Sequence, residues 1–456
     1  MTERKRRQFL IALIDAVLLY VALYLALTFR SGRIPSKAEW LAHLWPFAIV
    51  NAGWILCFYT AGLYGFEIIF NWDLLIRRLV ASASIATLGS AALFYVYKSP
   101  GISPKTVLLI FAIFATVLIF LSRAAFARVT TTVLKKRGVA YMGNYRQSIQ
   151  EIIDSADILE RMGYESRLIV DNGSFPADVA KGIRRVTDAE ALSEAVRSGD
   201  IDLIVIADEK ALAPEIRSLL FSLLEDGAKF LNLYDFYEIL FRRTPLDGID
   251  ETWFLEKIDL SSKKPYMAAK RIIDIALAMI VLLITAAFWP FVALAIKLSS
   301  YGPVFFTQLR LGRLGVPIRI IKFRTMRIDG NDQRPTGEKD TRITSIGIFL
   351  RKTRIDEIPQ MFNVLRGDMS FVGPRPERPE LAEELARRIP YYRQRLFVKP
   401  GLTGWDQVSG EYHSPSDEDT FKKLQADLYY VKNLSLSLDA SIFFKTILTV
   451  LKGGGR

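Results

Sequence analysis

The chain has 456 residues, which is too long for one ordinary core and predicts two or more domains. Hydrophobic residues make up 51% of the sequence, and the formal net charge is +12. A basic charge suits nucleic acid or an anionic membrane, and the long uncharged runs favour the membrane and argue against nucleic acid. With one cysteine and two histidines, the sequence excludes an internal disulfide framework and a structural zinc cluster.

Four apolar runs occupy the first third of the chain, and each has about the 20 residues that a helix needs to cross a bilayer. They are Phe9–Phe29, Pro46–Leu63, Leu79–Tyr97 and Val107–Phe126. Basic residues concentrate before the first run and after the second and fourth, which predicts four transmembrane helices within residues 1–135 and both ends in the cytoplasm. Asp15 lies inside the first run, where we expect it to snorkel or to pair with another helix.

Residues 136–260 are predicted to form a degenerate Rossmann-like domain. Short apolar runs alternate there with helical stretches, a pattern typical of a parallel sheet with crossover helices. A dinucleotide site needs a glycine-rich turn after the first strand, and this turn contains only Gly143. Asp171 stands where a ribose-binding acid could lie. We expect a scaffold, regulatory or oligomerisation module, with nucleotide binding as the alternative.

A fifth apolar segment, at about 271–299, is long enough to cross a membrane but carries Pro290 in its interior. Proline lacks an amide donor and disrupts a straight helix at a cost of about 3 kcal/mol. Basic residues flank both ends, so both flanks favour the cytoplasmic side. This predicts a re-entrant membrane helix broken at Pro290, and the alternative is an ordinary kinked crossing.

Three segments after this helix combine arginine, lysine and carboxylate residues. Residues 322–326 alternate basic and apolar side chains, so an extended strand would present Lys322 and Arg324 on one face. Residues 350–360 place the adjacent Asp356 and Glu357 among basic residues that include Arg351. Residues 367–376 hold an arginine between two prolines, which fix the backbone and favour bidentate contact with a phosphate: Pro374, Arg375 and Pro376.

This combination indicates phosphoryl transfer. A diphosphate substrate needs cations, usually including Mg²⁺, more than a strong base. A carboxylate can act as the nucleophile or as a magnesium ligand. Because Pro359 disfavours helix at Ile358, we expect Asp356 and Glu357 in the turn that leads into a helix. The alternative is that the two carboxylates only pair with neighbouring arginines on a solvated surface.

Residues 270–451 strongly resemble the bacterial sugar transferases, which are monotopic polyprenyl-phosphate phosphoglycosyl transferases. The resemblance is carried by Lys-Phe-Arg-Thr-Met at 322–326, Asp-Glu-Ile-Pro-Gln at 356–360, Asn-Val-Leu-Arg-Gly-Asp-Met-Ser-Phe-Val-Gly-Pro-Arg-Pro at 363–376 and Lys-Pro-Gly-Leu-Thr-Gly-Trp at 399–405. The first 260 residues look, more loosely, like the large members that initiate exopolysaccharide or O-antigen synthesis.

The resemblance implies an α/β catalytic domain at 265–456 on the cytoplasmic face of the bacterial inner membrane. It implies a ping-pong reaction in which Asp356 attacks the sugar-bearing phosphorus of a UDP-sugar, UMP leaves, and a polyprenyl phosphate such as undecaprenyl phosphate takes the sugar phosphate. Glu357 would assist, with Mg²⁺ or in acceptor activation, and Asp356 and Glu357 are the expected ligands of the metal. The substrate-binding residues implied by the matching motifs are Lys322, Arg324, Arg351, Pro374, Arg375 and Pro376. Pro290 matches the proline that breaks the family's membrane helix, and a homodimer is a further expectation.

One departure concerns the loop after Trp405. Many family members have an arginine where this chain has Glu411, so the identity of the sugar stays open. Two other functions are alternatives. A membrane-anchored nucleotide-sugar dehydratase or epimerase would use the middle domain to bind NAD, and a polysaccharide-assembly scaffold would use it for self-association.

Overall fold

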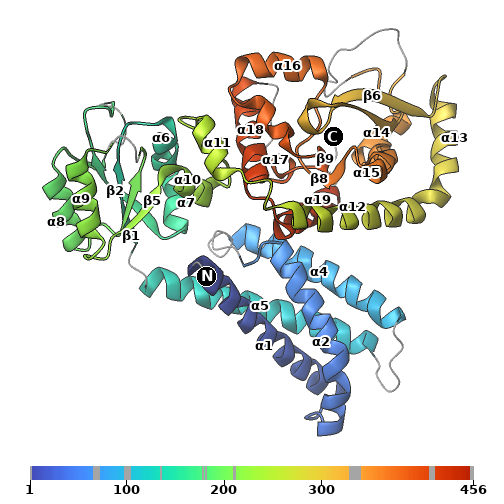
Figure 1. Cartoon of the computed structure of the whole chain (residues 1–456). Helices are drawn as coiled ribbons and strands as arrows, with labels where there is room; N and C mark the ends of the chain where they lie inside the picture. Colours follow the sequence, from blue (N-terminus) through green and yellow to red (C-terminus); the bar gives the residue numbers. More distant parts are fainter. Residues whose placement is uncertain are drawn as a thin grey trace. The chain divides into compact units, whose positions relative to one another are not determined.

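The computed structural model describes residues 3–64, 72–96, 104–133, 136–176, 179, 182–208, 212–327, 340–409 and 416–451. Within it the chain divides into two compact units, Met1–Leu240 and Phe241–Arg456. Figure 1 shows the apolar helices and a parallel sheet in the first unit, and mixed helices and short strands in the second. The domain boundaries expected from the sequence stay predictions.

The first unit begins with long apolar helices: α1 (Glu3–Ser31), α2 (Lys37–Thr60), α4 (Trp72–Val96) and α5 (Pro104–Val133). Each contains a stretch long and apolar enough to cross a membrane. Trp54, Phe58 and Phe111 are fully buried between the helices, whereas Trp45 and Leu88 are more than 70% exposed. Large exposed apolar side chains on long helices suit lipid rather than water, so the chain is a membrane protein.

An ion pair lies inside this helical bundle. The Arg123 guanidinium of α5 donates to both carboxylate oxygens of Asp15 in α1, at 3.0 and 2.6 Å. Both side chains are at most 2% exposed. Asp15 therefore pairs with another helix, which was one of the two outcomes expected from the sequence.

A five-stranded parallel sheet follows, in the order β3-β2-β1-β4-β5. Its strands are β1 (Arg137–Met142), β2 (Tyr164–Val170), β3 (Arg184–Val186), β4 (Leu203–Ile206) and β5 (Lys229–Asn232), and the helices between them are α6 (Gln147–Asp154), α7 (Ala156–Arg161), α8 (Ala189–Arg197) and α9 (Pro214–Leu223). The parallel α/β prediction is confirmed. The edge strand β3 was missed, because two of its three residues are arginines and it carries no apolar run.

Other segments of the protein pack closely against the turn that follows β1. Gly143 has a φ of +111°, and a Cβ there would lie 3.2 Å from the Ala207 Cβ and from the Asp208 nitrogen. The Ser174 hydroxyl accepts a hydrogen bond from the Tyr145 amide at 2.9 Å. The glycine therefore allows close packing against the end of β4, and the Tyr145 amide is engaged by the loop that follows β2.

The second unit contains the remaining apolar segment as two helices. Helix α12 (Lys264–Thr285) ends in the 3-10 turn η1 (Ala286–Phe288), and α13 (Trp289–Ser299) begins there with Pro290 in its first turn. Proline is tolerated at that position because the amide it lacks would have no partner in the helix. Figure 1 shows α12 and α13 running in different directions. The helix is therefore interrupted just before Pro290.

The rest of this unit begins with α11 (Glu251–Lys257), which precedes α12, and after α13 continues with the antiparallel hairpin of β6 (Phe305–Leu311) and β7 (Pro317–Phe323). Next come α14 (Ser345–Lys352), the 3-10 turn η3 (Ile355–Gln360), α15 (Met361–Arg366) and β8 (Ser370–Val372). The last elements are α16 (Pro379–Arg388), η4 (Tyr392–Phe397), β9 (Gly401–Thr403), α17 (Trp405–Val408), α18 (Asp417–Lys432) and α19 (Leu436–Leu451). Helix α10 (Leu233–Phe241) links the two units.

Two polar contacts join the start of α12 to this core. The Arg271 guanidinium donates to the carbonyls of Val364 and Leu365, the latter at 2.6 Å, and so caps the end of α15. The Asp274 carboxylate accepts from the Phe371 amide of β8 at 3.1 Å. These contacts hold α15 and β8, which directly follow the turn of Asp356 and Glu357, against the first half of α12.

Candidate active site

Asp356 and Glu357 lie in η3, the turn that runs directly into α15. Arg354 precedes the turn with a left-handed backbone, φ +58°, which ends α14 and redirects the chain. Pro359 lies within the turn and prevents a regular helix before Met361. The position expected from the sequence, a turn leading into a helix, is therefore observed.

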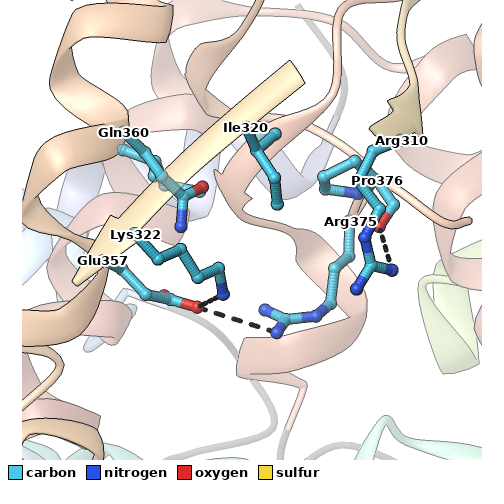
Figure 2. A pocket seen from close by; sticks show the side chains of 9 residues that line it. Arg310, Ile320, Lys322, Glu357, Gln360, Arg375 and Pro376 are labelled. Carbon is cyan, nitrogen blue, oxygen red and sulfur yellow. Dashed lines mark hydrogen bonds and ion pairs between the residues drawn. The ribbon is translucent and has the colours of Figure 1, made fainter. Parts of the chain in front are cut away.

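Three cations surround the Glu357 carboxylate. Lys322 of β7 donates to Oε1 at 2.7 Å, Arg375 lies 3.7 Å from Oε1, and Arg354 lies 3.6 Å from Oε2. Figure 2 shows Lys322 and Arg375 converging on this carboxylate from different parts of the chain. The Glu357 side chain is only 14% exposed. The Glu357 carboxylate is therefore largely shielded from solvent, whereas Arg354 and Arg375 stay partly exposed, at 36% and 39%.

The two adjacent carboxyl groups have opposite electrostatic surroundings. Burial alone would raise the pKa of Glu357, but Lys322, Arg375 and Arg354 together lower it to about 2. Burial, followed by the neighbouring Glu357 charge, raises the pKa of Asp356 to about 6, because Lys322 and two arginines compensate only in part. Asp356 Oδ1 is buried, and no hydrogen-bond partner for it exists in the described part of the chain. Asp356 is therefore the less stabilised carboxylate and Glu357 the firmly ionised one.

Close backbone packing holds the loop that carries Arg375. Strands β8 and β9 pair in parallel immediately before Pro374 and after Pro400. A Cβ on Gly373 would lie 2.4 Å from the Lys399 carbonyl oxygen, and one on Gly401 would lie 2.1 Å from the Gly373 nitrogen. Both positions therefore require glycine, since a side chain would push the two segments apart and displace Arg375.

A small cavity lies beside this cluster, with an empty volume of about 280 Å³. Its lining combines cations, one carboxylate, one amide and apolar groups: Arg310, Ile320, Lys322, Glu357, Gln360, Arg375, Pro376, Gly401 and Leu402. Figure 2 shows the Gln360 amide directed toward the space between Lys322 and Ile320.

Some of the predicted substrate-binding residues line the cavity and others do not. Lys322, Arg375 and Pro376 line the cavity with Glu357. Arg351 belongs to α14 and does not line the cavity. Its Nε donates to the Thr325 hydroxyl at 2.9 Å, and burial lowers its pKa. Pro374 contributes backbone only, since its carbonyl accepts from the Gly401 amide at 3.0 Å.

Arg324 lies away from the cavity. Its guanidinium donates to the carbonyls of Ser300 and Tyr301, at 2.7 and 3.0 Å, just beyond the end of α13. Strand β7 ends at Phe323, so the alternation that would have placed Lys322 and Arg324 on one face ends between them. The two side chains therefore have different partners, and the expected shared face is not observed.

Replacing Arg324 with alanine is expected to destabilise the second unit. Arg324 is 4% exposed, so its loss leaves the carbonyls it binds without donors, at a cost of about 1–3 kcal/mol. The measurement is the thermal unfolding midpoint of the purified protein in detergent. Arg388→Ala is the matched control, because Arg388 is 48% exposed and pairs with Glu384 and Asp417 at the surface. Equal midpoints for the two variants would contradict the structural role.

Two cavity residues with polar side chains, Arg310 and Gln360, were not identified from the sequence as site residues. Arg310 is one of the basic residues that follow the apolar segment, and the hairpin places it opposite Ile318 and at the cavity. Gln360 belonged to a quoted motif but was given no role, although its position one helical turn after Glu357 could have indicated it. Glu411 lies outside the described residues.

Comparison with known proteins assigns the family. Residues 265–453 match the family model of the bacterial sugar transferases. The chain is 44% identical over 192 residues to a UDP-N-acetylgalactosamine-undecaprenyl-phosphate N-acetylgalactosaminephosphotransferase of Aeromonas hydrophila, covering 42% of this chain and 45% of that one. It is 35% identical over 268 residues to a UDP-glucose:undecaprenyl-phosphate glucose-1-phosphate transferase of Escherichia coli K12, covering 58% and 57%.

A longer match is to a UDP-glucose:undecaprenyl-phosphate glucose-1-phosphate transferase of Klebsiella pneumoniae, 32% identical over 325 residues, or 70% of this chain and 68% of that one. The matches to the Aeromonas and Escherichia proteins span only about half of their lengths. These matches, together with the motifs around Glu357 and Arg375, show that this chain is a member of the bacterial sugar transferase family.

Proposed function

We propose that this protein transfers a sugar 1-phosphate from a UDP-sugar to a polyprenyl phosphate and releases UMP, as the first step of exopolysaccharide or O-antigen synthesis. The observation that carries the proposal is the cavity in which Lys322 and Arg375 meet beside Glu357 and the adjacent Asp356. The names of the relatives, which act on UDP-sugars and undecaprenyl phosphate, support the substrate class.

In the first step a carboxylate oxygen of Asp356 attacks the phosphorus next to the sugar. A bond forms between that oxygen and phosphorus, and the bond from phosphorus to the UMP oxygen breaks, so UMP leaves with the electron pair. In the second step a phosphate oxygen of the polyprenyl phosphate attacks the same phosphorus. The bond to Asp356 breaks and the carboxylate is regenerated.

The surrounding residues bind and orient the diphosphate. Lys322 and Arg375 offer positive charge at the cavity, and the buried Glu357 fixes both cations by direct ion pairs. Gln360 presents an amide that can donate to a phosphate or sugar oxygen. Because the pKa of Glu357 is held at about 2, Glu357 is a poor proton acceptor while its cations are bound, and its main role is to position them.

The donor set fits Mg²⁺. The unpartnered buried oxygen of Asp356 is the hard carboxylate ligand that the ion prefers, whereas the Glu357 oxygens are engaged by cations. Groups of three or more metal-ligating side chains are absent from the described residues. Mg²⁺ commonly uses one or two carboxylates plus substrate phosphates, so Asp356 would hold it together with the diphosphate. When bound, the ion would supply positive charge against the departing UMP.

The membrane arrangement is proposed with the reaction. The helices of residues 1–135 are inferred to cross the inner membrane four times, and α12 with α13 to form a re-entrant helix, because the chain is interrupted before Pro290. The catalytic segment would then lie on the cytoplasmic face, where a UDP-sugar is soluble and a lipid phosphate is accessible. The Rossmann-like sheet is assigned to scaffolding or self-association, and a homodimer stays a prediction.

The test is UMP release by purified protein with a panel of UDP-sugars, Mg²⁺ and undecaprenyl phosphate. We expect one UDP-sugar to yield UMP in multiple turnovers, and about one equivalent of UMP per enzyme when the acceptor is omitted, because the first step then stops at the covalent intermediate. UMP release that needs the acceptor even in the first turnover would contradict the two-step route. Failure of every UDP-sugar, or NAD bound to the protein, would favour the scaffold or the dehydratase.

A further inference from the structure

The backbone carbonyls of the loop that carries Arg375 accept hydrogen bonds from donors in three other segments. The Pro374 carbonyl accepts from the Gly401 amide at 3.0 Å, and the Glu377 carbonyl from the Leu311 amide at 2.9 Å. The Arg375 carbonyl accepts from Arg395 at 3.1 Å. The Pro376 carbonyl accepts from Arg310 at 3.3 Å. Four consecutive carbonyls are thus hydrogen-bonded, in a segment where prolines already fix two φ angles.

Arg395 is the more deeply buried of the two arginine donors, at 2% exposure against 22% for Arg310. It belongs to η4 and does not line the cavity that the Arg375 side chain lines. One terminal nitrogen of its guanidinium lies 2.6 Å from the Asp427 carboxylate of α18 and also donates to the Arg375 carbonyl. The other donates to the Tyr392 hydroxyl at 2.7 Å. The planar guanidinium of Arg395 therefore connects helix α18, the turn η4 and the loop that carries Arg375.

The charge around Arg395 is balanced within the protein. Asp427 is 1% exposed, and Glu377 lies 3.9 Å from the second terminal nitrogen. Glu377 in turn pairs with Lys423 of α18 and, at 3.7 Å, with Arg310. A buried ion pair of this kind adds little stability compared with a well-packed apolar cluster. What the guanidinium supplies, and an apolar side chain could not, is the hydrogen bond to the Arg375 backbone.

The Arg375 side chain itself is 39% exposed and pairs with Glu357 at 3.7 Å, a long distance for an ion pair. Glu357 therefore fixes the guanidinium only in part, and the direction in which the side chain enters the cavity also depends on its backbone. A displacement of about 1 Å at such a group can lower a rate about 100-fold. The position of the Arg375 guanidinium against a phosphate thus depends on the hydrogen bonds to the backbone of this loop.

We infer that Arg395, held by Asp427, is a positioning residue that acts through the backbone of Arg375 and fixes that side chain against the diphosphate of the donor substrate. The inference rests on the proposed function, in which Arg375 contacts the diphosphate. It assigns a role to a pair of side chains that does not line the cavity.

The experiment is a double-mutant cycle in the full-length protein, measured as kcat/KM for UMP release with the UDP-sugar that gives most UMP in the panel. Arg375→Ala should lower kcat/KM about 100-fold, as loss of one transition-state donor does. Arg395→Lys keeps the charge beside Asp427 but cannot reach all three acceptors, and should lower kcat/KM about tenfold. In the double variant we expect no loss beyond that of Arg375→Ala, because there is no guanidinium left to position.

Asp427→Asn is the second variant, and it keeps the shape and an oxygen acceptor while removing the counter-charge. Its smaller loss should also vanish in the Arg375→Ala background. Arg388→Lys, in an exposed ion pair, is the matched control and should leave kcat/KM unchanged. Thermal unfolding midpoints accompany each variant.

The outcomes separate the two levels of the proposal. If Arg375→Ala leaves UMP release unchanged, the phosphate contact in the proposed function is wrong. If Arg375→Ala is impaired and Arg395→Lys and Asp427→Asn lower kcat/KM by the same factor with and without Arg375, or if neither variant folds, the pair only stabilises the domain and the positioning inference is overturned.

Discussion

Asp356→Asn is expected to lower the first-turnover release of UMP by at least about 1,000-fold, the scale on which loss of a nucleophile acts. The amide has nearly the shape of the carboxylate but cannot form the bond to phosphorus. With a UDP-sugar labelled in the sugar, wild-type protein should retain label covalently in the absence of acceptor, and the variant should not. The burst of UMP and the retained label measure the same step independently.

The fold should tolerate this change. Burial raises the pKa of Asp356 to about 6, so the folded protein already disfavours the charged form, and a neutral amide removes an unfavourable charge at pH 7. Asp157→Asn is the control, since Asp157 is 63% exposed and pairs with Arg161 at the surface. A folded Asp356→Asn protein that still forms the labelled intermediate would show that another group is the nucleophile.

Glu357→Gln is expected to lower first-turnover UMP release about 100-fold and to move its pH dependence to lower pH. The rate falls because Lys322 and Arg375 lose the carboxylate that holds them at the cavity. The pH dependence moves because the Glu357 charge is, after burial, the main cause of the raised pKa of Asp356. Without that charge the pKa of Asp356 falls, and the nucleophile stays ionised at lower pH.

The measurement is the burst rate between pH 4.5 and 8, roughly the range in which side chains near neutrality titrate. In the wild type the rate should fall about tenfold per pH unit below the Asp356 pKa of about 6, where the attacking carboxylate becomes protonated. Glu357→Asp, which keeps the charge, is the matched control and should keep a midpoint near that of the wild type. A midpoint that stays the same or rises in Glu357→Gln would refute the electrostatic coupling of the two carboxyl groups.

Periodicity and local stereochemistry predicted much of this structure. Apolar runs marked the long helices and the parallel strands β1, β2, β4 and β5. The signal is continuous in β1 and β4 because these strands are buried on both faces. Pro290 and Pro359 marked the break between α12 and α13 and the turn of Asp356, because proline acts on the backbone beside it.

Contacts between distant segments were beyond the reach of sequence patterns. Arg324 was expected beside Lys322, but the end of a strand separated them, and strand ends are set by tertiary contacts. Arg310 and Arg395 depend on partners 66 and 20 residues away in sequence, and spacing alone cannot identify such partners. For the same reason the sequence could supply a list of basic residues for the site but could not show which of them contact the Glu357 carboxylate.

The buried pair of Asp15 and Arg123 constrains how the protein is made. The first apolar helix emerges from the ribosome carrying a carboxylate whose partner is synthesised 108 residues later. A lone acidic or basic residue at the centre of a membrane helix costs roughly 2.5–3.5 kcal/mol on insertion scales. Until α5 has been made, Asp15 lacks this partner, and pairing with Arg123 then offsets the cost of the buried carboxylate. Assembly of this region thus joins α1 and α5, so a truncation between them would leave Asp15 without Arg123.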